Sequence, residues 1–443
     1  MIYMNNKERR KFGAHLTSID IFEEHILPKI ENTLDNYIWV DLYCGEGNLI
    51  LPILKKIPLE KRNSFFEKNI FLFDVQKDMV EKAINNAQTY GIKEELARKN
   101  INERDTIKKF PQELLSLEKP IFHITNPPYL YLGYIAKHEE NKEQKKYFEN
   151  ENNGLQDLYQ IALMNDLRNK LNKMIYIIPS NFLFGASVSN RIRSDFLPNY
   201  KIDNAIIFEK KIFDFTGTNV IICFFSKSKT ELNINEFDAT KINSEKTTRH
   251  YILKAENNYR AGGGFEDYIK NNKLNQPLKV SYYLKKKEIL DNKGNKQVVL
   301  LNSKEYTGKS YSKQTFLVNN LLFNKIKSNP FFIRTVDTGS TEGRAGLYSI
   351  KDTFGVDGIF VEGATYRTNP IQLFIEPTLD ENQNKSLRDT FNKVLEELRK
   401  KTDSEFMTTY KYSTGKKKGY TRKYLGLSQA KKLLETISVK LAQ

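Results

Sequence analysis

Cysteine is scarce in this sequence, with only Cys44 and Cys223 among 443 residues. Both stand in apolar surroundings, and their spacing matches no metal-binding pattern. We therefore expect no metal site and a reducing, intracellular setting.

Long apolar runs are also missing. No stretch approaches the length of a membrane span, and residues 1–7 lack the apolar core of a signal peptide. We expect a soluble, cytoplasmic protein with no membrane partner. There is no internal repeat and no long low-complexity linker either.

Acidic side chains become sparse in the second half of the chain. The whole chain has 70 Lys and Arg against 54 Asp and Glu, a formal net charge of +16. Residues 1–229 hold 33 basic and 30 acidic residues, whereas residues 230–443 hold 37 and 24. A nearly neutral half followed by a basic half suggests an enzyme with a polyanion-binding region, most simply for nucleic acid. Composition alone fits equally well a lysine-rich protein with solvated faces.

The chain is organised around Asn126-Pro127-Pro128-Tyr129, which follows the apolar run 121–124. This run predicts a buried strand, and the prolines make a rigid turn at its carboxyl end, the edge where open α/β sheets bind ligands. The loop can hold the Asn126 amide oxygen and the Pro127 carbonyl as paired acceptors beside the ring of Tyr129. Such a site suits an exocyclic amino group on a planar ring. The alternative is a proline turn with no chemical role.

A second motif comes earlier in the chain. The expected strand 38–41 ends in Asp41, and Gly45 and Gly47 lead into an apolar helix. The glycines let a ligand approach the backbone, and the helix start offers free N–H groups. The next expected strand, 70–74, ends in Asp74, where nucleotide-binding α/β folds place an acceptor for ribose hydroxyls. A helix N-cap is the structural alternative for Asp74, as it is for Thr17 before the helix near residue 20.

Strand and helix patterns alternate up to about residue 228 and then stop. The near-continuous apolar strands predict a doubly wound α/β sheet dominated by parallel strands. We expect a catalytic domain at 1–229 and a mixed α+β domain at 230–443. Within the second, residues 285–301 predict a hairpin with its turn at 292–294.

Taken in order, these motifs resemble the γ group of DNA amino-methyltransferases, the adenine-N6 modification enzymes of type II restriction–modification systems. The resemblance covers residues 9–228. It implies a Rossmann-like domain that uses S-adenosylmethionine, followed by a target-recognition domain that binds double-stranded DNA. The Gly…Thr-Pro motif of the family is matched by residues 12–17, with Ser18 in place of the proline.

The resemblance assigns a role to each matched residue. The catalytic residues would be Asn126, Pro127, Pro128 and Tyr129. The cofactor would contact Thr17, Asp41, Gly45, Gly47, Asp74, Asp105 and Asn126, with Asp105 at its adenine. Tyr129 and Phe213 would stack on the extruded base, with Phe215 as the alternative to Phe213.

The basic second half supplies the candidate DNA contacts. They come from glycine-rich loops and lysine clusters: Arg260, Lys285, Lys286, Arg344, Lys417 and Arg422. The resemblance also implies a separately encoded restriction endonuclease as a partner, and we expect a monomer.

The implied mechanism begins with rotation of the target base out of the duplex, because a stacked base is out of reach. Asn126 and Pro127 would accept hydrogen bonds from its amino group while the methyl group passes in line from the sulfonium. Positioning and charge complementarity, rather than a strong base, would supply the acceleration. The first position of the tetrapeptide is usually Ser in cytosine-N4 enzymes and Asn or Asp in adenine enzymes, so Asn126 favours adenine.

Three other readings remain open. Ribosomal-RNA methyltransferases and enzymes that methylate a glutamine amide use the same tetrapeptide, because both substrates carry a planar conjugated nitrogen. A DNA-binding subunit with a degenerate cofactor fold is the alternative without enzymatic activity.

Overall fold

The computed structural model describes residues 17–213, 219–307, 310–337, 344–360, 370–414 and 419–439. The chain divides into two compact units, Met1–Ala261 and Gly262–Gln443. None of the helices in the described part of the chain combines the length and apolarity that a bilayer crossing requires.

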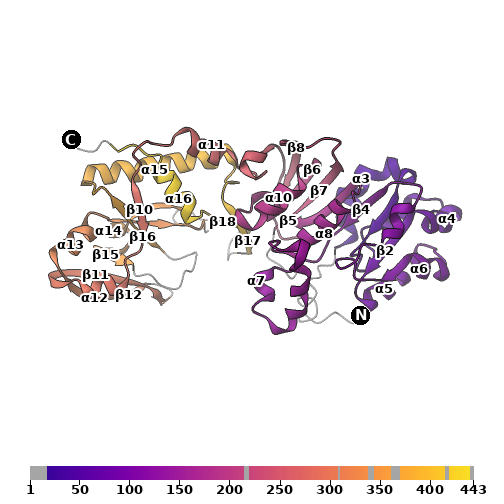
Figure 1. The fold of residues 1–443 in the computed structure, drawn as a ribbon, viewed down its shortest axis with the longest axis horizontal. Coiled ribbons are helices and arrows are strands. Elements are labelled where there is room, and N and C mark those ends of the chain that lie inside the picture. The colour runs from indigo at the N-terminus through magenta and orange to yellow at the C-terminus, as the bar shows by residue number, and fades with distance from the viewer. Residues whose placement is uncertain are drawn as a thin grey trace. The chain divides into compact units, whose positions relative to one another are not determined.

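The first unit is built on one nine-stranded sheet with the order β3-β2-β1-β4-β5-β7-β6-β8-β9 (Figure 1). Strands β3, β2, β1, β4 and β5 are parallel, β7 is antiparallel to both β5 and β6, and β8 is parallel to β6. The strands are β1 (Ile38–Asp41), β2 (Ile70–Asp74), β3 (Ile101–Glu103), β4 (Ile121–Thr125), β5 (Lys173–Pro179), β6 (Tyr200–Phe208), β7 (Val220–Lys227), β8 (Ile234–Ile242) and β9 (Lys246–Lys254).

Helices cover both faces of this sheet. The first face packs against helices that follow β4 in the chain: α7 (Leu132–Ile135), the 3₁₀ helix η5 (Glu139–Phe148), α8 (Leu158–Arg168), α9 (Asn181–Phe184) and α10 (Asn190–Phe196). The second face packs against α2 (Ile19–Ile21), the π turn η1 (Phe22–Ile26), α3 (Leu27–Ile30), α4 (Leu59–Asn69), α5 (Lys77–Thr89) and α6 (Glu94–Asn100).

The buried strands explain the continuous apolar runs in the sequence. On β5, Met174 and Tyr176 belong to the core on the first face, whereas Ile175 and Ile177 belong to the core on the second. Successive side chains of a strand point to opposite faces, so a strand covered on both sides needs apolar residues throughout. The expected doubly wound sheet is therefore confirmed as a mixed α/β fold with a large, parallel-rich sheet.

The sheet extends further along the chain than the sequence indicated. β8 pairs with β6, β9 pairs with β8, and Phe237, Tyr251 and Leu253 are buried in the core of the first face. The expected boundary at 229/230 would cut these strands from the sheet that they complete. The compact unit ends instead at Ala261.

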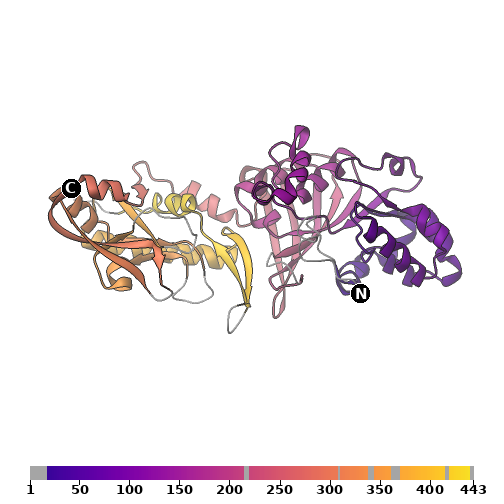
Figure 2. The same ribbon diagram turned by 90° about the horizontal axis from the view of Figure 1, so that it is seen from below.

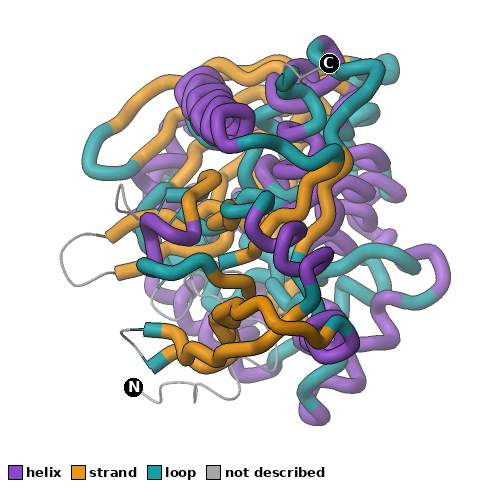
Figure 3. The backbone as a smooth tube through the Cα atoms, turned by 90° about the vertical axis from the view of Figure 1, so that its left-hand side faces the viewer, coloured by secondary structure: helices purple, strands orange, loops and turns teal. Residues whose placement is uncertain are grey.

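The second unit has mixed α and β structure (Figures 2 and 3). A four-stranded sheet has the order β10-β16-β13-β14, a three-stranded sheet has the order β12-β11-β15, and β17 pairs with β18. The strands are β10 (Lys279–Tyr282), β11 (Lys293–Tyr306), β12 (Tyr311–Val318), β13 (Phe331–Arg334), β14 (Gly346–Ser349), β15 (Gly358–Phe360), β16 (Ile371–Glu376), β17 (Thr408–Thr414) and β18 (Gly419–Tyr424). The helices are α11 (Gly264–Asn271), α12 (Lys286–Asp291), α13 (Asn320–Lys327), α14 (Ile350–Phe354), α15 (Glu381–Thr402) and α16 (Leu427–Leu434).

The long helix α15 supplies much of the core of this unit. Leu387, Phe391, Leu395 and Leu398 pack with apolar residues of the four-stranded sheet. The hairpin expected at 285–301 is wrong, because residues 286–291 form α12 and β11 pairs with β12 instead. Lys285 occupies the N-cap position of this helix, Lys286 is its first residue, and Ile289 is buried.

Candidate active site

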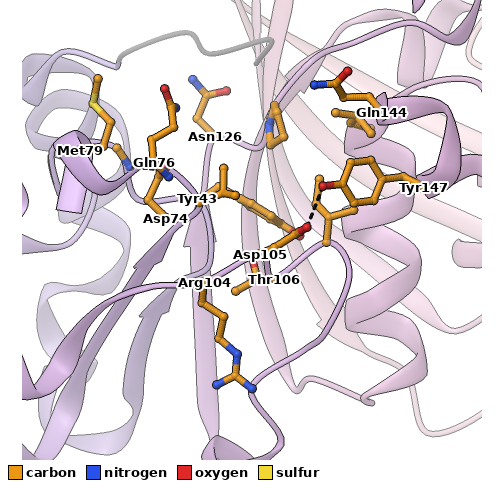
Figure 4. A pocket seen from close by; sticks show the side chains of 15 residues that line it. Tyr43, Asp74, Gln76, Met79, Arg104, Asp105, Thr106, Asn126, Gln144 and Tyr147 are labelled. Carbon is orange, nitrogen blue, oxygen red and sulfur yellow. Dashed lines mark hydrogen bonds between the residues drawn. The ribbon is translucent and has the colours of Figure 1, made fainter. Parts of the chain in front are cut away.

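A pocket opens at the carboxyl ends of β2, β3 and β4 (Figure 4). It encloses about 850 Å³ of space, part of which is open to solvent. Its lining residues are Tyr43, Gly45, Asp74, Val75, Gln76, Met79, Arg104, Asp105, Thr106, Ile107, Asn126, Pro128, Gln144, Tyr147 and Leu158. Gly45, Asp74, Asp105, Asn126 and Pro128, which the sequence singled out separately, thus meet in one pocket.

Asp41 does not line this pocket. It holds the loop that follows β1 through hydrogen bonds. Its Oδ1 accepts hydrogen bonds from the backbone N–H of Tyr43 (3.0 Å) and from the hydroxyl of Thr125 (2.6 Å). Burial raises the pKa of Asp41 to about 6. The carboxylate joins the glycine loop after β1 to the last residue of β4, directly before Asn126.

The glycine loop adopts a backbone that favours glycine. Gly45 has φ +53° and Gly47 has φ +81°. A Cβ atom at Gly47 would lie 2.6 Å from Cδ1 of Leu51. A residue with a side chain would be strained at this φ and would displace Leu51, which explains why glycine stands there.

Asp74 ends β2 with its carboxylate on the pocket wall. Oδ2 accepts from the N–H of Gly45 and Oδ1 from the N–H of Gln76, both at 2.9 Å. Burial raises its pKa. Asp74 is not the cap of the following helix, since α5 begins after Gln76 and has no side-chain cap. Each carboxylate oxygen can accept a further hydrogen bond, as a ribose hydroxyl would require.

Asp105 also lies in the pocket, two residues after β3. The hydroxyl of Tyr147 donates to its Oδ2 at 2.7 Å, and the backbone N–H of Lys108 donates to its Oδ1 at 3.1 Å. Tyr147 belongs to η5, a polar and charged segment in which no sequence motif singles out this residue. Its role in holding Asp105 was therefore missed.

The tetrapeptide at 126–129 forms hydrogen bonds with Thr17 and with β5. Asn126 Nδ2 donates to the hydroxyl of Thr17 at 2.9 Å. The Tyr129 hydroxyl lies within hydrogen-bonding distance of Asn126 Oδ1 and of the Ile177 carbonyl, 2.6 Å away. A phenol has one proton, so it can donate to only one of these acceptors at a time.

A buried polar cluster of His123, Asp166 and Tyr176, which the sequence did not predict, contacts the glycine loop. The backbone N–H of Leu42 donates to Nε2 of His123 at 3.3 Å, which places the ring proton on Nδ1. Nδ1 lies 2.6 Å from Oδ2 of Asp166, which also accepts from the hydroxyl of Tyr176 at 2.6 Å. The cluster joins β4, β5 and α8 to the loop that carries Gly45.

Phe213 is 5% exposed and belongs to the core of the second face, which Tyr129 also contacts. Its stacking role stays a prediction. The alternative, Phe215, lies outside the described residues, as does Lys417 among the candidate DNA contacts.

The other basic candidates have different surroundings. Lys285 and Lys286 are exposed at the start of α12. Arg344 pairs with Glu396 at 3.1 Å, and Arg422 lies in β18. Arg260 differs from the expectation of a surface contact, because it is 5% exposed in the first unit.

The described residues contain no group of side chains that could hold a metal ion.

Asp157 is a further site residue without a sequence signal. Its Oδ1 accepts from the backbone N–H of Leu130, directly after Tyr129, at 2.9 Å. It precedes α8, whose first residue, Leu158, lines the pocket. Burial raises the pKa of Asp157 to about 7. One carboxyl group thus connects the loop that begins at Asn126 to the pocket wall.

The raised pKa of Asp157 gives a stability prediction. A carboxyl group with a higher pKa in the folded state contributes stability at low pH that is lost as pH rises toward 7. Between pH 5 and 8 the wild type should lose about 2 kcal/mol more unfolding free energy than Asp157→Asn, which cannot ionise. Urea unfolding at both pH values measures this, with Asp78→Asn, an exposed site on α5, as the control. Equal losses in wild type and Asp157→Asn would contradict the assignment.

The model of the N-6 DNA Methylase family matches residues 2–314, well over half of the chain. A search of curated proteins found no match. Among solved structures, a modification subunit of a putative type I restriction enzyme from Vibrio vulnificus YJ016 is 16% identical (TM-score 0.39), with 52% of this chain and 48% of that chain covered.

Two further solved structures are similar at comparable levels. The type I restriction–modification methyltransferase subunit from Streptococcus thermophilus is 16% identical (TM-score 0.34), with 51% of this chain and 47% of that chain covered. The type IIL restriction–modification enzyme MmeI, in complex with DNA, is 12% identical (TM-score 0.48), with 98% and 76% covered. The chain spans about half the length of the Vibrio and Streptococcus proteins.

The family match confirms the resemblance that the motifs indicated: this chain belongs to the N-6 DNA methylase family.

Proposed function

We propose that the chain transfers a methyl group from S-adenosylmethionine to the N6 amino group of adenine in duplex DNA, as the modification enzyme of a restriction–modification system. The observation that carries this proposal is the position of Asn126. The start of the Asn-Pro-Pro-Tyr tetrapeptide lines the same pocket as Asp74 and Asp105. A methyl donor held by those two acids would therefore lie beside the acceptors for the target amine.

The pocket residues fit the proposed cofactor. Asp74 offers carboxylate oxygens to ribose hydroxyls, and Val75, Ile107 and Leu158 offer apolar surface to an adenine ring. Asp105 offers a carboxylate to the edge of that ring. When bound, S-adenosylmethionine supplies an electrophilic methyl group on its sulfonium.

The tetrapeptide would orient the target amine. Asn126 Oδ1 and the Pro127 carbonyl would accept its two hydrogens, which favours the pyramidal form that attacks. The Tyr129 hydroxyl reaches Asn126 Oδ1 but has the Ile177 carbonyl as a second acceptor. Turning that proton to Ile177 would release Asn126 Oδ1 for the substrate. The ring of Tyr129, with Phe213, would stack on a base rotated out of the duplex.

The two units would have separate roles in catalysis and DNA recognition. The first unit would be the Rossmann-like catalytic unit, and the basic second unit would recognise the DNA target, with Lys285, Lys286, Arg344, Lys417 and Arg422 as candidate contacts. A separately encoded restriction endonuclease, a monomeric state and a type II assignment stay predictions.

Cofactor affinity should depend on Asp74. A hydrogen bond to a charged acceptor contributes about 1.5–3 kcal/mol, so Asp74→Ala should bind S-adenosylhomocysteine roughly ten- to a hundredfold more weakly. Calorimetry measures the affinity, and Asp78→Ala, exposed on α5, is the matched control. Wild-type affinity in Asp74→Ala would remove this residue from the cofactor site.

Substrate competition separates this function from its rivals. With labelled S-adenosylmethionine, we expect methyl transfer to plasmid DNA that ribosomal RNA and glutamine peptides do not suppress. Preferred labelling of RNA would favour a ribosomal-RNA methyltransferase, and preferred labelling of peptide would favour glutamine methylation. No transfer by a chain that binds DNA would favour a non-catalytic binding subunit.

A further inference from the structure

The start of α8 contacts both the pocket and the loop that carries Tyr129. Leu158, the first residue of the helix, lines the pocket. The residues on either side of it contact the loop: Asp157 accepts a hydrogen bond from the N–H of Leu130, and the ring of Tyr159 packs against the ring of Tyr129. Two consecutive positions around one pocket residue therefore hold the end of the tetrapeptide, although none of the sequence motifs includes them.

The backbone directly after the tetrapeptide pairs with the residues before α8. Oδ1 of Asp157 accepts from the N–H of Leu130 at 2.9 Å. Tyr131 forms an antiparallel β-bridge with Asp157, and the N–H of Leu132 donates to the carbonyl of Gln156 at 2.8 Å. These contacts restrict the backbone at the end of the tetrapeptide, and so they limit the directions in which its last side chain can point.

The side chain of Tyr129 is held as well. Its ring is nearly perpendicular to the ring of Tyr159, with an interplanar angle of 89° and 6.4 Å between the ring centroids. Its hydroxyl lies 2.6 Å from the carbonyl of Ile177. Tyr159 is buried, whereas Tyr129 is half-buried. Edge-to-face aromatic pairs have a preferred geometry, so a fixed, buried ring orients a partly accessible one.

We infer that Asp157 and Tyr159 are positioning residues that orient Tyr129 for stacking on the rotated target base. This inference rests on the proposed function, which supplies the base. Asp157 acts through the backbone after Tyr129, and Tyr159 acts through its ring. A Tyr129 ring that is ordered before the base arrives costs less to immobilise on binding. Loosening it should weaken the hold on the base and leave the cofactor to Asp74 and the glycine loop.

A double-mutant cycle tests this inference by single-turnover methyl transfer to plasmid DNA. Stacking of a base on an aromatic ring contributes roughly ten- to a hundredfold to binding, so Tyr129→Ala should slow transfer by about that factor. Asp157→Ala should slow transfer several-fold in the wild type. In the Tyr129→Ala background it should change the rate by no more than about twofold, because residues that act through one another have non-additive effects. Calorimetry should show similar affinity for S-adenosylhomocysteine in all of these proteins.

Asn235→Ala is the matched control. Oδ1 of this buried residue accepts from the N–H of Ile202 at 2.8 Å, so the substitution also removes a buried side-chain acceptor from a backbone N–H. Asn235 lies on β8, which three strands separate from β4 in the sheet. Its effect on transfer should be the same with and without the Tyr129 ring, whatever urea unfolding shows for stability. Asp157→Asn keeps an acceptor oxygen and should transfer at close to the wild-type rate.

The outcomes distinguish this inference from the proposed function. If the wild type transfers no methyl group to DNA, the proposed function fails and the inference with it. If the wild type is active and the two losses multiply in the double variant, or if Asp157→Ala is as fast as wild type, only the inference fails. A loss of cofactor affinity that accounts for the slower transfer of Asp157→Ala would overturn it too. Should Asp157→Ala not fold, Tyr159→Leu replaces it in the same cycle, with Tyr159→Phe, which keeps the ring, as its control.

Discussion

Replacing Asn126 with alanine should lower the rate of methyl transfer about 10²- to 10³-fold, the usual loss when one group that stabilises the transition state is removed. Affinity for S-adenosylhomocysteine should change by no more than a few fold, because Asp74 and Asp105 would hold the nucleoside. Asn126 contacts Thr17 and Tyr129 and begins the loop after β4. We therefore expect its amide oxygen to meet the target base rather than the ribose.

Two measurements on Asn126→Ala separate these effects: single-turnover transfer to duplex DNA and calorimetric binding of S-adenosylhomocysteine. Asn126→Asp keeps the acceptor oxygens and should retain more activity than the alanine variant. Asn153→Ala, which is exposed beyond η5, is the control for losing an asparagine side chain. An Asn126→Ala protein that no longer binds the cofactor analogue would contradict the assignment of Asn126 to the target amine.

A chain ending at residue 261 should keep cofactor binding and lose site-specific DNA binding. The end point follows from the structure: the Ala261 N–H donates to the Leu183 carbonyl at 3.0 Å, and Arg260 Nε donates to the Phe184 carbonyl at 3.0 Å. Ending the chain at 229 would remove β8 and β9 together with the buried Tyr251 and Leu253. That shorter chain should be unstable and would test nothing about DNA.

Fluorescence anisotropy with cognate and random duplexes measures the loss. Specific recognition usually exceeds non-specific binding by roughly 10³-fold or more, and this ratio should fall to near one in the chain 1–261. Binding by the full chain should also weaken steeply with salt, because lysines and arginines displace counterions from phosphates. A truncated protein that discriminates as well as the full chain would place recognition in the first unit.

The sequence predicted those site residues whose conformation is set locally. Two prolines fix the loop that starts at Asn126, and positive φ angles at Gly45 and Gly47 explain why glycine stands there. Asp74 could be located because a buried apolar strand ends at that residue. In each case a few neighbouring residues carry the whole signal.

Residues that reach the site through tertiary contacts could not be found in this way. Gln144 and Tyr147 come from a polar stretch without apolar periodicity, whereas Asp157 stands directly before the apolar helix α8. The contacts of all three depend on how η5 and α8 pack. β8 was missed for a related reason. Its burial alternates along the strand, but the buried positions include Asn235 and Lys241, so apolar and polar residues do not alternate in the sequence.

Nucleoside analysis of the methylated product tests the central claim most directly. Duplex DNA incubated with the full chain and labelled S-adenosylmethionine would be digested to nucleosides and separated by chromatography with mass detection. Asn126 at the first position of the tetrapeptide predicts label in N6-methyladenine, confined to a short duplex site. Label found only in N4-methylcytosine would contradict the account.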